Sequence, residues 1–363
     1  MNNCNAIRWK RACLDEEPER IDSSMIKIHQ GRAGQRLRRA VIAATGSCLP
    51  EKILTNADLE KMVDTSDEWI TTRTGIKERR IAAEGESTAT LALAAARKAL
   101  ERAGLKGEEV EIIICATITP EMVFPATACF VQNGLKTPCC CAFDLSAACS
   151  GFIYGIAIAA SFIETGQYNN AVVLGAEVLS RITNYDDRTS CILFGDGAGA
   201  AVLRAEDDGE KGVLYSSLHA DGSGWETLSC QAYGSRYPIS QPLADANKKY
   251  MEIRGRETYQ VAVRRIVEMV EEAYSRCGIS NDDVALVIPH QMNARIIESV
   301  VKRLKLPEEK MFINIDKYGN TSSASIPIAL DEAVTEGKVK KGDLVVLVAF
   351  GAGLTWGVNL IKL

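Results

Sequence analysis

Short apolar runs alternate with longer amphipathic segments along the chain from residue 39 onward. Residues 39–49, 110–117, 171–179 and 197–205 are apolar runs of the length expected for buried strands. Residues 89–104 carry apolar side chains at helical spacing and end at a glycine, which predicts an amphipathic helix. Strands that alternate with helices in this way predict an α/β fold.

An uncharged stretch of 19 residues, 145–163, is long enough to cross a membrane. About half of it is Ala, Gly or Ser, and it lacks cationic or aromatic flanks. Such low hydrophobicity indicates a helix buried on all sides inside a large protein rather than a membrane span. We therefore predict a central helix here and no association with a membrane.

Three sequence matches indicate that the chain contains two copies of one unit. The segment RAGLKGEEVEIIIC, from Arg102, matches RCGISNDDVALVIP, 174 positions later. FDLSAAC matches IDKYGNT at an offset of 172, and FGDGAGAAV matches FGAGLTWGV at an offset of 156. These matches predict two α/β halves, residues 39–208 and 209–363, divided near the charged segment 206–212. Functional sites are expected where the two copies meet.

The first 38 residues do not fit this pattern. They mix basic and acidic side chains and contain no apolar run of seven or more, which excludes a secretory signal. Their acidic residues also argue against a transit peptide. We interpret residues 1–38 as a disordered leader, with Met25 as an alternative start of the chain.

Charge and cysteine content narrow the choice of partners and compartment. Forty-two Lys and Arg against 47 Asp and Glu give a net charge of −5, which provides no general attraction to nucleic acid or to an anionic membrane. The 12 cysteines follow no regular spacing over 363 residues, which favours reduced thiols and a cytoplasmic protein. The three histidines, His29, His219 and His290, are far apart and no paired CxxC motif occurs, so no metal site is predicted.

Three side chains are candidates for catalysis, one in the first copy and two in the second. Cys149 follows a predicted strand and begins the uncharged helix, where free N–H groups and the helix dipole favour a thiolate. His290 comes directly after a buried strand, at the carboxyl end where ligands bind in α/β folds. The repeat places Asn320 and Thr321 opposite Ala148 and Cys149. The three candidates are therefore expected to converge, the alternatives being a structural histidine and a helix-capping asparagine.

This trio suits chemistry on thioesters. A cysteine thiolate attacks a thioester and then carries the acyl group covalently. No buried acid is apparent to make His290 a strong base, so we interpret His290 and Asn320 as hydrogen-bond donors to an enolate oxygen. Decarboxylation of a malonyl thioester requires such donors. The glycines within residues 350–357 are expected to bring backbone N–H groups to the site and to complete an oxyanion hole.

Seven motifs resemble the β-ketoacyl-acyl carrier protein synthase III family across about residues 40–363. They are TSDEWITTRTGI from residue 65, DLSAACSGF around Cys149, FGDGAGAAVL from residue 194, LHADGS from residue 218, PHQMNARI around His290, YGNTSSAS around Asn320 and FGAGLTWG from residue 350. The resemblance implies a thiolase-like fold, with two duplicated α/β halves in a five-layer αβαβα sandwich, and a homodimer. It also implies condensation of acetyl-CoA, or another short acyl-CoA, with malonyl-acyl carrier protein to start type II fatty acid synthesis, without a tightly bound cofactor.

The same resemblance implies roles for individual residues. Cys149 is the acylated nucleophile, His290 and Asn320 stabilise the enolate, and the backbone N–H groups of Cys149 and Ala352 form the oxyanion hole. The implied CoA contacts are Thr65, Trp69, Arg73, Arg188, Gly255 and Asn293, with the adenine held between Trp69 and Arg188. The implied carrier-protein docking segment is Gln291, Met292, Asn293, Ala294 and Arg295. The implied acyl pocket contains Phe124, Leu179 and Phe194, with Phe124 closing the pocket of the partner subunit.

Three positions depart from the family pattern. Arg256 and Tyr259 stand where the family usually has Asn and Phe, and Ala352 stands where Gly is common. The change at residue 352 is mild because the backbone is the donor there, whereas Arg256 changes the expected thioester channel. The identity of the acyl-CoA primer therefore stays open.

Three other classes of protein share part of this pattern. A related CoA-primed condensing enzyme of polyketide or specialised lipid synthesis would share the chemistry, but TSDEWITTRTGI and PHQMNAR argue against it. A paralogue that only binds acyl carrier protein would not need the intact trio of Cys149, His290 and Asn320. A degradative thiolase would need a second reactive cysteine late in the chain, and no cysteine follows Cys277.

Overall fold

The computed structural model describes residues 38–207, 209–240 and 245–363, apart from the side chains of residues 256 and 257. Residues 38–363 form one compact unit. The predicted leader, residues 1–38, lies outside the described residues except for Arg38. The departure from the family pattern at residue 256 likewise concerns a side chain outside the description.

The first half contains a five-stranded sheet and the helices around it. Their bounds are β1 (Arg39–Cys48), α3 (Thr88–Ala103), β4 (Ile112–Ala116), α4 (Thr127–Leu135), β5 (Cys141–Leu145), α5 (Gly151–Glu164), β6 (Asn170–Glu177) and β7 (Gly197–Glu206). The strand order is β1-β7-β6-β4-β5, and the buried central strands β4 and β6 explain the unbroken apolar runs of the sequence. The predicted amphipathic helix is α3, which Ser87 caps and Gly104 ends in the left-handed conformation.

The second half contains a four-stranded sheet with the order β11-β12-β13-β8. Its elements are β8 (Gly212–Ala220), α6 (Gly255–Cys277), β11 (Leu286–Pro289), α7 (Ala294–Leu304), α9 (Ser325–Thr335), β12 (Leu344–Gly351) and β13 (Thr355–Lys362). β11 is parallel to β12, whereas β13 is antiparallel to both of its neighbours.

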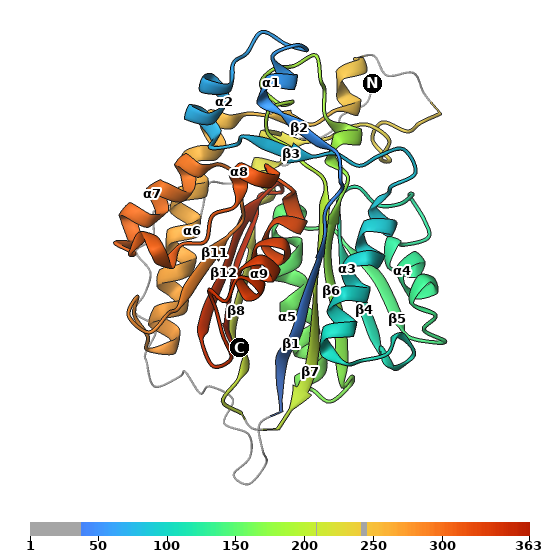
Figure 1. Ribbon diagram of the computed structural model, residues 1–363, viewed down its shortest axis with the longest axis vertical. Coiled ribbons are helices and arrows are strands. Elements are labelled where there is room, and N and C mark those ends of the chain that lie inside the picture. Colours follow the sequence, from blue (N-terminus) through green and yellow to red (C-terminus); the bar gives the residue numbers. More distant parts are fainter. Residues whose placement is uncertain (1–37, 208, 241–244) are drawn as a thin grey trace, which may run out of the picture. The chain divides into compact units, whose positions relative to one another are not determined.

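Helices and sheets stack in five layers (Figure 1). Helices α3 and α4 pack on the outer face of the first sheet, and α6 and α7 pack on the outer face of the second. Between the sheets, α5 and α9 share one apolar core with the inner faces of both. The uncharged stretch therefore supplies the central helix α5, as predicted, and the layers are those of the thiolase-like fold that the resemblance implied.

The two halves repeat one topology. The strand order β1-β7-β6-β4 of the first sheet corresponds to β8-β13-β12-β11 of the second. Gly104 and Gly278, 174 positions apart, end α3 and α6 with φ angles of 61° and 65°. The first sequence match therefore has the correct register. In place of a strand equivalent to β5, the second half has an isolated parallel bridge between Val287 and Met311.

The other two sequence matches are shifted by two positions. The short 3₁₀ turns η3 (Ala148–Ser150) and η8 (Ser322–Ala324) precede α5 and α9 and are 174 positions apart, so Cys149 corresponds to Ser323 rather than to Thr321. At the starts of β7 and β13, Gly197 pairs with the end of β6 and Thr355 with the end of β12, which gives an offset of 158 instead of 156. The segments that begin at Phe194 and Phe350 are similar in sequence but not structurally equivalent. Phe194 lies outside the named strands, whereas Phe350 lies within β12.

Smaller elements gather at one end of the sheets, where α1, α2, β2, β3 and α8 lie (Figure 1). The bounds are β2 (Ile53–Thr55), α1 (Asn56–Leu59), α2 (Asp67–Thr74), β3 (Glu78–Arg80), β9 (Leu228–Ser229), β10 (Glu252–Ile253) and α8 (Ile315–Tyr318). Further 3₁₀ turns are η2 (Gly107–Glu109), η4 (Leu179–Ile182), η5 (Gly222–Thr227), η6 (Ala246–Lys249) and η7 (Glu308–Lys310). None of the helices in the described residues combines the length and hydropathy needed to cross a membrane.

Candidate active site

The two halves meet around Cys149, which lies in η3 between β5 and α5. The residue is buried, with 6% of its surface exposed. A Cβ on Gly351, at the end of β12 in the second half, would lie 2.8 Å from the Cβ of Cys149, so only glycine fits there. The Ser150 hydroxyl donates to the carbonyl of Thr355 at 3.1 Å. The second half therefore closes directly over the candidate nucleophile.

The thiol of Cys149 is protonated at neutral pH. Burial raises its pKa from 9.0 to about 11, against hydrogen bonds from the Ser322 hydroxyl and from the N–H groups of Cys149 and Ala352, while the Glu177 carboxyl adds to the rise. Desolvation of the thiol therefore opposes the helix start, which favours the thiolate. The two N–H groups near the sulfur are those of the expected oxyanion hole.

Both backbone groups of Asn320, its N–H and its carbonyl, are hydrogen-bonded. Its N–H donates to the Leu193 carbonyl at 2.9 Å, and its carbonyl accepts from the Gly195 N–H at 3.1 Å. Its side-chain Oδ1 accepts from the N–H of Ser322 at 2.9 Å, which orients the carboxamide. Cys149 and Ser322 line the same cavity, so the residue that orients the Asn320 carboxamide lies close to Cys149.

His290 is a neutral, buried imidazole directly after β11, with 1% of its surface exposed. Desolvation lowers its pKa from 6.5 to about 3. Its Nδ1 lies 2.6 Å from the hydroxyl of Ser325, the first residue of α9. Ser325 comes three residues after Ser322, so His290 and Asn320 are attached to the same helix start. The turns η3 and η8 are themselves in contact.

Sequence reasoning missed the two serines that connect these groups and a buried acid behind them. Glu177, at the end of β6, is fully buried and accepts hydrogen bonds from the hydroxyls of Thr119 at 2.6 Å and Ser323 at 2.8 Å. Burial raises the pKa of its carboxyl. The available signals were an acid that ends an apolar strand and the hydroxyl-rich segment YGNTSSAS.

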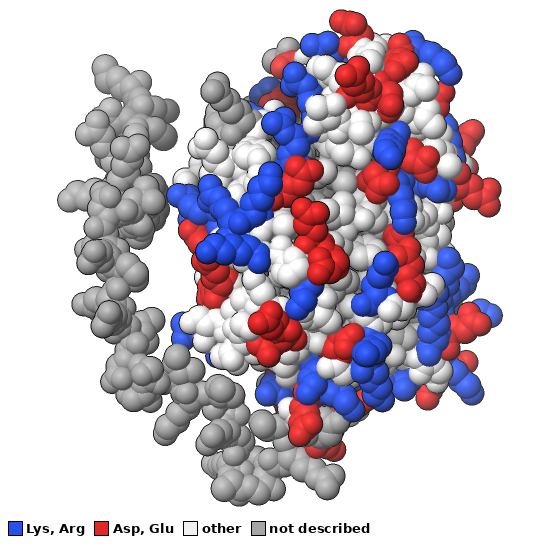
Figure 2. Space-filling view, turned by 60° about the vertical axis from the view of Figure 1, so that its left-hand side comes forward, with Lys and Arg blue, Asp and Glu red and all other residues white. Residues whose placement is uncertain are grey.

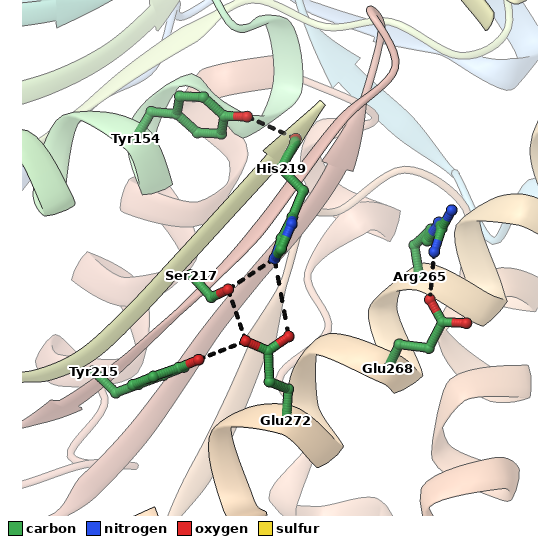
Figure 3. Close-up of polar contacts among 7 residues, drawn as sticks. All are labelled: Tyr154, Tyr215, Ser217, His219, Arg265, Glu268 and Glu272. Atoms are coloured by element: carbon green, nitrogen blue, oxygen red, sulfur yellow. Dashed lines mark hydrogen bonds and ion pairs between the residues drawn. The ribbon is translucent and has the colours of Figure 1, made fainter. Parts of the chain in front are cut away.

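His219, the other histidine of the described residues, belongs to a separate polar network on β8 and α6 (Figure 3). Its Nε2 lies 2.8 Å from the Ser217 hydroxyl and 3.9 Å from a carboxylate oxygen of Glu272. Its ring stacks on Trp356, and the Arg265 guanidinium lies 4.6 Å from the centroid of the same indole. We therefore assign His219 to the packing of β8 and β13 against α6 rather than to the site at Cys149.

A cavity of about 1210 Å³ opens from the Cys149 side of the site. Leu179 and Phe194, two residues of the expected acyl pocket, line it together with Met251. Phe124 is 81% exposed and does not line the cavity of its own chain. The structure therefore places two of the three expected residues at the pocket and leaves Phe124 on the surface.

The residues expected to bind the CoA nucleotide cluster on and beside α2. The guanidinium carbons of Arg73 and Arg188 lie 4.5 Å and 5.1 Å from the centroid of the Trp69 ring. The Thr65 hydroxyl is buried without a hydrogen-bond partner among the described residues, so it is available to a ligand. Gly255, in contrast, is the first residue of α6, and a Cβ there would meet nothing within 4 Å.

The expected docking segment divides into structural and exposed residues. Gln291 is 1% exposed, and its carboxamide bonds Pro289, Phe312 and Asn314, so Gln291 is wrong as a docking contact. Arg295 is exposed at the start of α7. Residues 292–294, between these two, fix the position of α7. Met292 packs into the core and Ala294 packs against Gly75. Asn293 caps the helix and donates to the Arg73 carbonyl.

Surface charge alone does not mark a docking face. Figure 2 shows blue and red side chains interspersed over the viewed face, with one group of Lys and Arg gathered at its left edge. A contact with a carrier protein would therefore depend on individual exposed residues such as Arg295 rather than on a uniform basic surface.

The described residues contain no group of three or more His, Cys, Asp or Glu side chains that could hold a metal ion. All cysteines of the described residues are free thiols.

A duplicated five-layer fold that brings a cysteine of one half against polar groups of the other defines a condensing enzyme of the thiolase fold. Residues 143–222 match the family model described as 3-Oxoacyl-[acyl-carrier-protein (ACP)] synthase III, and residues 274–363 match the model of its C-terminal part. The chain belongs to the β-ketoacyl-[acyl-carrier-protein] synthase III family, whose members are acyltransferases that initiate fatty acid synthesis.

Individual relatives support this assignment. The chain is 55% identical over 323 residues to Beta-ketoacyl-[acyl-carrier-protein] synthase III of Caldanaerobacter subterraneus subsp. tengcongensis, a match that covers 89% of this chain and 97% of the relative. The crystal structure of the Aquifex aeolicus VF5 synthase III matches with a TM-score of 0.83 at 50% identity, over 89% of this chain and 100% of that one. The Thermus thermophilus structure matches with a TM-score of 0.83 at 44% identity, over 89% and 99%.

Proposed function

We propose that the protein joins a short acyl-CoA, with acetyl-CoA as the reference primer, to malonyl-acyl carrier protein through an acyl group on Cys149. The observation that carries the proposal is the contact between the turns η3 and η8, which brings Cys149 of one turn to Ser322 of the other, whose N–H holds Oδ1 of Asn320. A nucleophile and an enolate donor thus share one site. The proposal includes no tightly bound cofactor and no metal.

The first half-reaction transfers the acetyl group. The Cys149 sulfur attacks the thioester carbonyl, and the N–H groups of Cys149 and Ala352 donate to the oxyanion that forms. The carbon–sulfur bond to CoA then breaks, and the thiol proton of Cys149 leaves with the CoA sulfur. Because burial raises the pKa of the thiol to about 11, loss of the thiol proton adds to the free-energy cost of this step.

The second half-reaction forms the carbon–carbon bond. Malonyl-carrier protein loses CO₂, and the enolate oxygen accepts hydrogen bonds from Nε2 of His290 and Nδ2 of Asn320. The Ser325 hydroxyl accepts from the Gln291 N–H at 3.4 Å and can donate to Nδ1, which leaves the imidazole proton on Nε2. The enolate carbon attacks the acetyl carbonyl, acetoacetyl-carrier protein is released, and the Cys149 thiolate takes a proton from solvent.

Both substrates would reach this site along the surface of α2 and α7. The exposed guanidinium of Arg188 and the ring of Trp69 would bind the CoA adenine, which requires the two groups to separate from their present 5.1 Å. Arg295 would meet acidic side chains of the carrier protein. Asn293 connects the two regions, because it caps α7 and donates to the carbonyl of Arg73 in α2.

We further propose that the protein works in the cytoplasm as a homodimer paired through β5. This strand has a hydrogen-bonded neighbour only on the β4 side, and an unpaired edge invites a second strand. Val123 and Phe124, 89% and 81% exposed, are apolar side chains that a second copy would cover. Phe124 would then close the cavity of the partner subunit. Free thiols throughout the described cysteines fit a reducing compartment.

The function is tested by mass spectrometry after incubation with acetyl-CoA. We expect one acetyl group per chain, on the peptide that contains Cys149; no adduct, or an adduct elsewhere, would overturn the proposal. Cys149→Ala should lose this adduct and still decarboxylate malonyl-carrier protein, whereas His290→Ala and Asn320→Ala should lose decarboxylation. Equal losses in both half-reactions for all three variants would refute the division of roles. A panel of acyl-CoA chain lengths then identifies the primer.

A further inference from the structure

Arg79, in β3, is a fully buried cation in the neighbourhood of Asn320. None of its surface is exposed, and its guanidinium donates to the Leu54 carbonyl at 3.1 Å, to Oδ1 of Asn56 at 2.9 Å and to the Ile192 carbonyl at 2.7 Å. All three acceptors are neutral, and no ion pair joins Arg79 to a carboxylate within the described residues. The hydrogen bonds to this charge therefore come only from neutral groups of the described residues, and the Glu78 carboxylate acts on it from a distance.

Such an arrangement is costly in stability. A buried charge loses its hydration, and hydrogen bonds to neutral acceptors return only part of that free energy. Burial lowers the pKa of the Arg79 side chain to about 10, in agreement with this strain on the charged form. An apolar side chain of similar length would fill the same space without the charge, so the benefit of an arginine here lies in the geometry that its fixed donors impose.

That geometry leads directly to Asn320. The guanidinium holds the carbonyl of Ile192, and the next residue, Leu193, accepts the hydrogen bond from the Asn320 N–H. Gly195 completes the bridge by donating to the Asn320 carbonyl. The head group of Arg79 thus anchors the segment that pairs with Asn320 on both of its backbone groups.

The aliphatic part of Arg79 supports the same bridge. A Cβ on Gly195 would lie 3.1 Å from the Cβ of Arg79, and a Cβ on Gly319 would lie 3.4 Å from the same atom. The stem therefore packs against the glycine that bonds Asn320 and against the glycine that precedes it. Cys149 has separate support, from Gly351 and from the hydrogen bond between Ser150 and Thr355.

We propose that Arg79 is a positioning residue that fixes residues 192–195, and through them the Asn320 carboxamide, for decarboxylation of the malonyl thioester. The inference rests on the proposed role of Asn320. Cys149 has supports of its own at Gly351 and Thr355, and it shares with residues 192–195 only the cavity lined by Phe194. Loss of the guanidinium should therefore slow the second half-reaction much more than the first.

The experiment compares Arg79→Met, Arg79→Lys and wild type in the two half-reactions. Arg79→Met keeps the aliphatic stem and loses the three hydrogen bonds, so we expect kcat for decarboxylation of malonyl-carrier protein to fall about 10- to 100-fold. The rate of Cys149 acetylation by acetyl-CoA, followed by intact mass, should fall at least about fivefold less than decarboxylation, because the supports of Cys149 at Gly351 and Thr355 are intact and only the Phe194 side of its cavity is loosened. Arg79→Lys keeps the charge and part of the bonding, and should fall between Arg79→Met and wild type.

Two further variants make the result decisive. Arg102→Met removes the ion-pair partner of the buried Asp331 carboxylate, which keeps its hydrogen bonds from Thr45 and Ser47, and it controls for general destabilisation; it should change neither half-reaction. In the double variant Arg79→Met/Asn320→Ala, decarboxylation should fall no further than in Asn320→Ala. Additive losses, or equal losses in both half-reactions, would overturn the positioning role. A normal decarboxylation rate in Asn320→Ala alone would instead reject the proposed function of Asn320.

Discussion

The two copies of the fold begin their central helices with the same backbone conformation and different chemistry. Ala148 before α5 and Ser322 before α9 have φ angles of 45° and 49°, and each is the first residue of a 3₁₀ turn. Each turn packs against the end of a strand in the other half. Cys149 meets Gly351 of β12, whereas the Ser323 hydroxyl donates to Glu177 of β6.

The difference lies in the two strand ends, which are equivalent positions of the repeat. Gly351 contributes no side chain, so a thiol and two N–H groups share the space above it. Glu177 fills the corresponding space with a carboxyl group that satisfies surrounding hydroxyl and N–H donors. The same duplicated fold thus forms an open reactive pocket at Gly351, where the strand end has no side chain. At Glu177, where a carboxyl group occupies the equivalent position, it forms a closed polar core.

The strongest test of this comparison moves the nucleophile to the equivalent position. In Cys149→Ala/Ser323→Cys, the new thiol faces the Glu177 carboxyl and lacks the two N–H donors, so condensation should fall by more than about 10⁴-fold and no acetyl adduct should form. Intact mass after incubation with acetyl-CoA is the measurement, with Ser323→Cys alone as the control that keeps Cys149. Acetylation at residue 323 would show that the two positions are chemically interchangeable.

A second test fills the open strand end. Gly351→Ala places a methyl group 2.8 Å from the Cβ of Cys149, so the turn must shift, and we expect acetylation to slow about 100-fold. Gly222→Ala is a matched control, because a Cβ at residue 222 would meet nothing within 4 Å. The measurement is the rate of acetylation by quench and mass spectrometry. Equal rates in the two variants would mean that the close approach of Gly351 has no role.

A third test disturbs the closed strand end. Glu177→Gln replaces an acceptor oxygen with an NH₂ group that faces the hydroxyl donors of Thr119 and Ser323, so the free energy of unfolding should fall by about 2 kcal/mol. Denaturant titration measures this change. Ser323→Ala, which removes one donor and keeps the carboxylate, should cost less. Unchanged stability in Glu177→Gln would remove the contrast between the two strand ends.

The smallest expected effect concerns His290, whose equivalent in the first half is Ala116. The folded-state pKa of His290 is about 3, below its ordinary 6.5, so between these values the unfolded chain binds a proton that the folded chain does not. Stability therefore falls as the pH falls, by about 1 kcal/mol between pH 6.5 and 5.5. His290→Gln should lose this slope in denaturant titrations at several pH values, and His219→Gln should keep it. An unchanged slope in His290→Gln would contradict a neutral buried imidazole.

Apolar patterning and the repeat were sufficient to predict the α/β class, the duplication and the central helix. They could not give the correct register of the second and third matches. Glycine-rich loops of different length shift residues that look alike in sequence away from structurally equivalent positions. Cys149 and Ser323 are equivalent only through their backbone conformation, which no sequence match reported. The resemblance to a known family supplied the fold's five layers, which the structure confirms.

The chemistry of the site was predicted less completely than its location. The protonated thiol of Cys149 results from desolvation, a property of the whole fold rather than of a helix start. Ser322 and Ser325 carry the contacts to the catalytic candidates, yet serines in a loop are too common to single out. The sequence places Gln291 within a docking motif and gives no sign of its burial, because two of its three hydrogen-bond partners, Phe312 and Asn314, are brought near only by the fold.

The interior bonding of Gln291 has a consequence for the meeting of enzyme and carrier. The carboxamide of Gln291 is hydrogen-bonded to both β11 and residues 312–314, so the start of α7 is held in one position. For the docking proposed at Arg295, this fixed position of α7 lowers the entropy that binding of a carrier protein would cost, which favours its affinity.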